Sequence, residues 1–298
     1  MKESILFVII VSVFLVFLLS YNEEKNSAFA ISDSIPKSDG VTKLNKINKT
    51  IDFFHSSDRG EENVSIPISR LLFNVTIIRN TDGTNTFQIA LDPKFSKFYE
   101  EVGNFKMRKN IVVVYPAFTQ AAYDKNGFYY YYAKSCDTKC LTVNIPKAPK
   151  LGYHTSQTAV IIFNLLNYSI ITDITLDKNP SILKKYDKVI LLHNEYVTKK
   201  EFEAITKHPN VVYLYPNALY AEVKTDYTKN TMTLVKGHGY PSADISNGFG
   251  WKFDNSKFEY DYKCKNWKFA KIVNGKMLNC YPRYQLLYDS ALLKEIVK

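Results

Sequence analysis

The sequence predicts an α/β fold with a central, mostly parallel sheet flanked by helices. Three apolar runs support this fold class: IVVVY at 111–115, KVILLH at 188–193 and VVYLY at 211–215. Solid runs of this kind are typical of strands that are buried on both faces. Helical segments separate the runs, and this β-α-β order favours parallel strands joined by right-handed crossovers.

Residues 1–30 are predicted to direct export, either as a signal peptide or as an N-terminal anchor. The apolar run 5–19 follows Lys2 and precedes the small-x-small sequence 28–30, as in export signals. Fifteen helical residues span only about 22 Å, less than a bilayer core of roughly 30 Å. The apolar run ends about ten residues before Ala30, which is long for a cleavage region, so an uncleaved anchor remains the alternative. Either way, we expect the chain to be exported and to be secreted or attached to the cell surface.

Residues 31–60 are rich in Ser, Lys, Asn and Asp, and we interpret them as a flexible linker. Residues 61–105 are predicted to form an N-terminal β-hairpin extension. Two β-rich runs within 65–92 flank the sequence Thr81-Asp82-Gly83-Thr84, and an Asp-Gly pair between such runs is a strong hairpin signal.

The main α/β domain is predicted to span residues 106–298. After the first strand and a long aromatic loop, a helix is expected from Thr155, and a short strand at 169–174. Thr198-Lys-Lys-Glu201 is a capping box that opens a helix at 199–207. The aromatic-rich segment 225–298 is predicted to contain a β-hairpin turning at Asn274-Gly275, followed by a closing helix at 284–297.

The four cysteines are predicted to form disulfides, because an even number of cysteines in an exported chain favours them. We expect the pairs Cys136–Cys140 and Cys264–Cys280, since the members of each pair lie in one local segment. A zinc site built from all four is the alternative, although zinc-binding pairs usually have tighter spacing.

The net charge of +10 does not predict nucleic-acid binding. Only five of the 39 basic residues are Arg, the residue type best suited to gripping phosphates and reading bases. We interpret the many lysines as solvated surface and expect no nucleic-acid partner.

Polar side chains follow each of the three predicted strands. Tyr123 follows the first strand, His193 and Glu195 end the second, and Asn217 follows the third. Ligands bind at the carboxyl ends of strands in open α/β sheets, so we expect these side chains to converge. They suit metal binding or acid–base chemistry, although each can also be structural. The turn Gly237-His238-Gly239 is interpreted as structural.

Several other kinds of site are not supported by the sequence. It contains no nucleophile elbow, and no Cys stands at a strand-to-helix turn. It also contains no Gly-rich dinucleotide fingerprint and no P-loop. We therefore expect neither a Ser or Cys triad nor nucleotide binding.

Three segments within 110–223 resemble the family defined by the C-terminal region of the N,N-dimethylformamidase large chain: TQAAYDKNGFY, YDKVILLHNEYVTKKEFEAI and VVYLYPNALY. The architecture is also similar to glutamine-amidotransferase-like, flavodoxin-like folds. The resemblance implies a mononuclear iron held by Glu195, Tyr123 and a second tyrosine, for which Tyr153 is the choice. It also implies that His193 is an acid–base or water-orienting group and that Asn217 donates to substrate or water.

Two functions are expected from this resemblance. The first is an exported, iron-dependent hydrolase of small amide C–N bonds that uses metal-activated water. The alternative is a non-catalytic cell-surface binding module that keeps the fold without the metal. A small molecule is the expected partner. The membrane is expected as a partner only through an uncleaved anchor. Proteins of the family work with a small partner chain, and whether this protein does is left open.

Overall fold

The computed structural model describes residues 42–45, 49–57, 60–79, 81, 85–147, 154–259, 261 and 263–298. These belong to one compact unit, residues 36–298. The predicted signal or anchor at 1–30 lies outside the described residues. No helix within the described ranges is long and apolar enough to cross a membrane.

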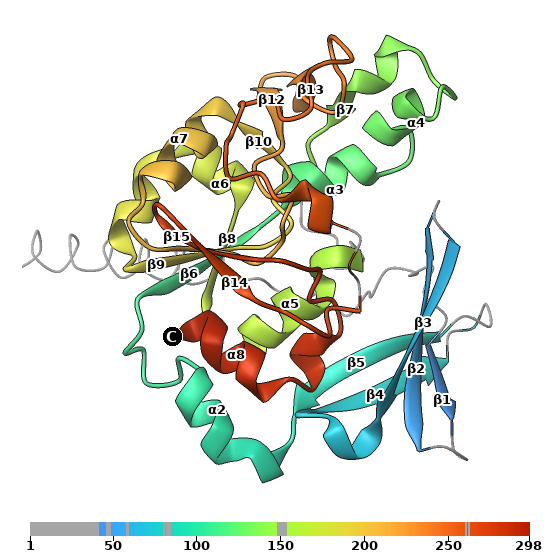
Figure 1. Cartoon of the computed structure of the whole chain (residues 1–298), viewed down its shortest axis with the longest axis vertical. Coiled ribbons are helices and arrows are strands. Elements are labelled where there is room, and N and C mark those ends of the chain that lie inside the picture. Colours follow the sequence, from blue (N-terminus) through green and yellow to red (C-terminus); the bar gives the residue numbers. More distant parts are fainter. Residues whose placement is uncertain are drawn as a thin grey trace, which may run out of the picture. The chain divides into compact units, whose positions relative to one another are not determined.

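Six strands form the central sheet, in the order β14-β15-β11-β9-β6-β8 (Figure 1). In chain order they are β6 (Ile111–Tyr115), β8 (Ser169–Thr172), β9 (Lys188–Leu191), β11 (Val211–Tyr213), β14 (Phe269–Ile272) and β15 (Gly275–Leu278). All neighbours pair in parallel except β14, which is antiparallel to β15. The predicted α/β class with a mostly parallel central sheet is therefore confirmed.

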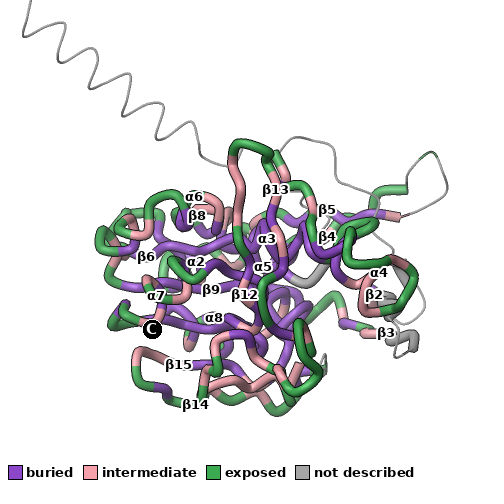
Figure 2. Tube along the Cα trace, turned by 90° about the horizontal axis from the view of Figure 1, so that it is seen from above, coloured by how far each residue is buried: buried purple, intermediate pink, exposed green. Residues whose placement is uncertain are grey.

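The apolar composition of the central strands follows from their burial. Every residue of β6, β9 and β11 is buried (Figure 2), so neither face of these strands needs a polar position. Helices cover both faces of the sheet: α6 and α7 lie on one side, and α5 and α8 on the other (Figure 1). They span α5 (His154–Leu165), α6 (Asp173–Lys178), α7 (Lys199–Lys207) and α8 (Ser290–Val297).

Two helix starts show how side chains set the boundaries. The predicted capping box is formed, with Thr198 Oγ1 accepting the Glu201 N–H at 3.3 Å and Glu201 Oε2 accepting the Thr198 N–H at 2.7 Å. The closing helix begins at Ser290, later than the predicted residue 284. Asp289 Oδ1 accepts the Leu292 N–H at 2.9 Å, and this N-cap sets the start of α8.

The segment after β6 is helical rather than the predicted aromatic loop. It contains α3 (Ala117–Tyr123) and α4 (Phe128–Tyr132). Six consecutive residues of α3 are buried, from Ala117 to Ala122, so tertiary packing rather than amphipathic periodicity stabilises this helix.

A second sheet of four strands lies beside α3 and α4. Its order is β10-β12-β13-β7, and its strands are β7 (Thr142–Asn144), β10 (Tyr196–Thr198), β12 (Ala221–Asp226) and β13 (Thr231–Lys236). A shared core joins this sheet to the two helices, with Phe118 and Phe128 packing in one cluster with Tyr196, Val223 and Leu234.

The N-terminal part of the unit is built from antiparallel strands. β1 (Thr42–Asn45), β2 (Thr50–Ser57) and β3 (Gly60–Pro67) form one sheet, and β4 (Phe73–Arg79) pairs with β5 (Asn85–Leu91) as the predicted hairpin. The predicted linker 31–60 is corrected here, because β1 and β2 lie inside it. Ile51 and Phe53 alternate with polar residues and are buried, and this pattern of period two favours a strand.

Both disulfides pair as predicted. Cys136 bonds to Cys140, and Cys264 bonds to Cys280. No thiolate is left to form the alternative zinc site. Two disulfides fit a protein that resides outside the cell.

Candidate functional site

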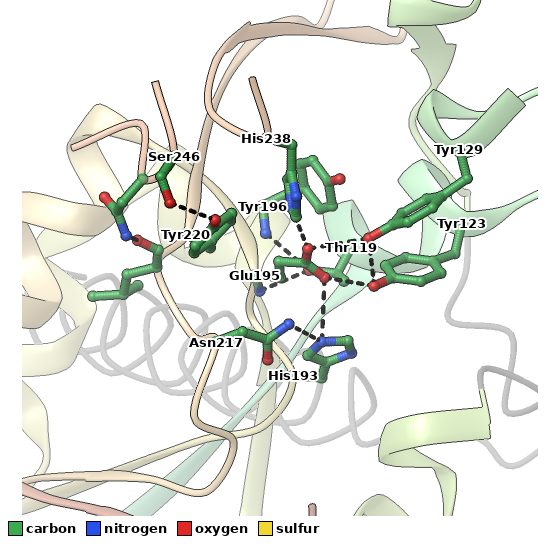
Figure 3. A network of polar contacts seen from close by, with 12 residues as sticks. Thr119, Tyr123, Tyr129, His193, Glu195, Tyr196, Asn217, Tyr220, His238 and Ser246 are labelled. Atoms are coloured by element: carbon green, nitrogen blue, oxygen red, sulfur yellow. Dashed lines mark hydrogen bonds and ion pairs between the residues drawn. The ribbon is translucent and has the colours of Figure 1, made fainter. Parts of the chain in front are cut away.

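Four of the five predicted catalytic and metal-binding residues meet at the carboxyl edge of the central sheet (Figure 3). His193 and Glu195 follow β9, Asn217 follows β11, and Tyr123 ends α3, the helix after β6. His193, Glu195 and Asn217 are each at most 1% exposed, whereas Tyr123 is 37% exposed. Tyr123 therefore marks the side on which the site opens to solvent.

Helices α3 and α5 hold the backbone of the loop after β9. Thr119 Oγ1 accepts the N–H groups of Glu195 at 3.0 Å and Tyr196 at 3.2 Å. Ser156 Oγ accepts the His193 N–H at 3.2 Å. These bonds satisfy buried backbone donors and hold the segment that carries Glu195.

The Glu195 carboxylate is the centre of the site, and each of its oxygens contacts one tyrosine and one histidine (Figure 3). Tyr123 Oη donates to Oε2 at 2.8 Å, and His193 Nε2 lies 3.2 Å from the same oxygen. Tyr129 Oη donates to Oε1 at 3.2 Å, and His238 Nε2 lies 2.5 Å from it. The two phenol oxygens are themselves 2.6 Å apart.

The electrostatics of this cluster keep Glu195 charged. Burial alone would raise the pKa of Glu195, but the charge and the hydrogen bond of His238, together with the neighbouring His193, outweigh burial and hold this pKa well below its usual value. Burial, reinforced by the negative Glu195, raises the pKa of Tyr129 well above its usual value. The Tyr129 phenol is therefore protonated at neutral pH and donates to the carboxylate.

His193 belongs to a second group of contacts beneath the carboxylate. Its Nε2 lies 2.9 Å from both Asn217 Nδ2 and Tyr281 Oη, and Tyr281 Oη donates to Asn217 Oδ1 at 2.9 Å. An amide nitrogen can only donate. The bond to Asn217 therefore uses the lone pair of His193 Nε2.

Three residues join the site that the sequence analysis did not assign to it, namely Tyr129, Tyr281 and His238. Tyr129 belongs to the run Tyr129–Tyr132, which signals a concentration of phenols near Tyr123. Tyr281 follows β15, a strand parallel to β11, so the strand-end rule would have found it had β15 been recognised as part of the central sheet. His238, interpreted as structural, contacts Glu195 directly. Tyr153 lies outside the described residues.

The donors around Glu195 fit a hard, trivalent metal ion. Two phenol oxygens and a carboxylate lie 2.6–3.2 Å from one another, which allows all three to face one ion. If a bound ion displaced the protons of both phenols, two phenolates and one carboxylate would supply three negative charges, and tyrosinate is an established iron ligand. Within the described ranges, no three His, Cys, Asp or Glu side chains are arranged to hold a metal, so binding here would depend on the phenols.

Comparisons with known proteins do not identify the chain. It matches no protein-family model, and no curated protein matches it.

Proposed function

We propose that this protein is an exported hydrolase of small amide C–N bonds, with one iron ion held by Tyr123, Tyr129 and Glu195. The observation that carries the proposal is the convergence of two phenols on one fully buried carboxylate, with His193 beside them. The resemblance to the dimethylformamidase family implies the same types of ligand. In this proposal Tyr129 is the second tyrosine that the resemblance implies, in place of Tyr153.

When bound, the iron would supply Lewis acidity and lower the pKa of a water molecule at the site. The residues of the chain perform the remaining tasks. Tyr123 is the exposed member of the cluster, so a small amide would approach from its side. Asn217 and Tyr281 hold His193 Nε2 in place. We assign to His193 the transfer of a proton from water to the leaving amine, a step for which the Asn217 amide must release the Nε2 lone pair. Hydrolysis then forms the new C–O bond and breaks the C–N bond.

A non-catalytic binding module is the second candidate, and one observation favours it. Both oxygens of Glu195 already have phenol and histidine partners, so the cluster is internally satisfied without an ion. In this case a small ligand would bind at the surface around the exposed Tyr123, without a metal.

In both cases we propose export of the chain, as a secreted or cell-surface protein. The two disulfides support this proposal. A small partner chain, as in the family that the sequence resembles, can be detected by mass measurement of the purified native protein.

The hydrolase proposal predicts that iron-loaded protein releases amine from small N-alkyl formamides. Glu195→Gln should lower the rate at least about 100-fold, as expected for loss of a major electrostatic element of an active site. Glu201→Gln is a matched control, because Glu201 is an equally buried glutamate bound to Thr198 rather than to the site. Equal rates in the wild type and Glu195→Gln, or no release from any formamide tested, would contradict the hydrolase.

A further inference from the structure

His238 lies on a tight turn between two glycines, and all three residues have positive φ values. Gly237, His238 and Gly239 have φ values of 125°, 53° and 75°, and the turn is closed by reciprocal bonds between Gly237 and Tyr240 at 2.9 and 3.0 Å. Left-handed backbone is uncommon for non-glycine residues, and histidine is one of the residue types that adopt it more often than others. Such conformations occur preferentially at functional sites.

Aromatic side chains fix the direction of the His238 ring. Tyr196 stacks on it with centroids 5.4 Å apart and planes at 24°, and Tyr220 lies 4.4 Å away. The ring directs Nε2 to Glu195 Oε1 at 2.5 Å, while 19% of the side chain is exposed. The turn and the tyrosines thus hold one nitrogen against the carboxylate, near the solvent-exposed side.

The two histidines at Glu195 differ in how their Nε2 atoms are engaged. His193 Nε2 accepts from Asn217 and also contacts Tyr281. Within the described part of the chain, Glu195 is the hydrogen-bond partner of the His238 ring. The two imidazoles also contact different oxygens of Glu195, with His193 Nε2 3.2 Å from Oε2 and His238 Nε2 2.5 Å from Oε1.

We propose that His238, and not His193, is the nitrogen ligand of the metal site, beside Tyr123, Tyr129 and Glu195. This inference rests on the proposed iron site and extends it from three ligands to four. Imidazole is a good ligand for iron, and His238 Nε2 adjoins the Glu195 oxygen that also contacts Tyr129. His193 then acts from outside the ligand set, where Asn217 and Tyr281 hold it.

The test is pulsed electron paramagnetic resonance of the full chain loaded with Fe(III), which detects the nitrogen of a directly bound imidazole. The variants are His238→Asn and His193→Gln. Asparagine tolerates left-handed backbone and is favoured in tight hairpin turns, so His238→Asn keeps the turn and removes the imidazole. Circular dichroism and intact disulfides verify folding, and His238→Gln is the second variant if His238→Asn does not fold.

We expect the nitrogen coupling in the wild type and in His193→Gln, and its loss in His238→Asn. Iron affinity alone does not discriminate, because losing a partner of a ligand typically costs 10–100-fold in affinity. Coupling that survives in His238→Asn, or that disappears only in His193→Gln, would overturn this inference while leaving the iron site standing. A wild type that binds no iron would instead overturn the proposed site itself.

Discussion

Two fully buried glutamates show how surroundings decide the charge of one residue type. Glu195 has a histidine and a tyrosine on each oxygen, and its pKa lies well below the usual value. Glu201 has the backbone and hydroxyl of Thr198 as neighbours, together with the carboxylates of Asp173 and Asp177. Burial, followed by the charge of Asp173, raises the pKa of Glu201 well above the usual value.

The raised pKa of Glu201 makes a prediction about stability and pH. As pH rises above about 4.5, the glutamate of the unfolded chain ionises while Glu201 in the fold stays protonated, so its contribution to stability falls. Glu201→Gln removes this loss and keeps an acceptor for the Thr198 N–H. We expect the variant to be more stable than the wild type at pH 8 by on the order of 1–3 kcal/mol. The difference should shrink near pH 4.

Urea unfolding of both proteins at the two pH values measures this difference. Glu195 has the opposite effect, because its lowered pKa stabilises the fold at pH values above the ordinary pKa of glutamate. Comparing the two proteins at each pH cancels this contribution. The raised pKa of Glu201 would be refuted if Glu201→Gln were less stable than the wild type at pH 8, or if the stability difference between the two proteins did not depend on pH.

At the scale of elements, the hairpin β14–β15 connects the edge of the sheet to the site. β15 pairs in parallel with β11, and Tyr281 follows it to contact His193 and Asn217. The pairing needs a close backbone approach at Gly275, where an added Cβ would stand 1.8 Å from Val211 O at a φ of 155°. Only glycine fits this position.

Gly275→Ala is therefore expected to destabilise the protein by on the order of 2–4 kcal/mol, from overpacking and backbone strain together. Gly250→Ala is the matched control, because Gly250 also has a positive φ but no atom lies within 4 Å of its added Cβ. Its cost should be about 1 kcal/mol. Thermal unfolding monitored by circular dichroism compares the two, and equal losses would show that the β15 approach is not critical.

At the scale of the whole molecule, the parallel sheet was predictable because its strands are buried on both faces and therefore read as solid apolar runs. The strand-end rule then predicted that Tyr123, His193, Glu195 and Asn217 would meet. What it could not predict are side chains delivered by elements with weak local signals. Helix α4 lies in a segment that was interpreted as a loop, and the His238 turn follows a strand of the second sheet. The hairpin β14–β15 was predicted, but its place in the central sheet was not.

The N-terminal strands show the same limit. β1 and β2 occupy a largely polar segment in which the apolar alternation at Ile51 and Phe53 is short, so tertiary contacts set their pairing partners. The local sequence pattern thus predicted the central parallel sheet. The other sheets, and the site residues Tyr129 and His238, depend on contacts between distant parts of the chain.

The measurement that tests the central claim most directly is the iron content of the purified protein, with its visible spectrum, beside Tyr123→Phe and Glu195→Ala. The account predicts about one iron per chain, a phenolate-to-iron absorption band, and loss of that band in both variants. A wild type that holds no iron, even after reconstitution with ferric or ferrous salts, would contradict it.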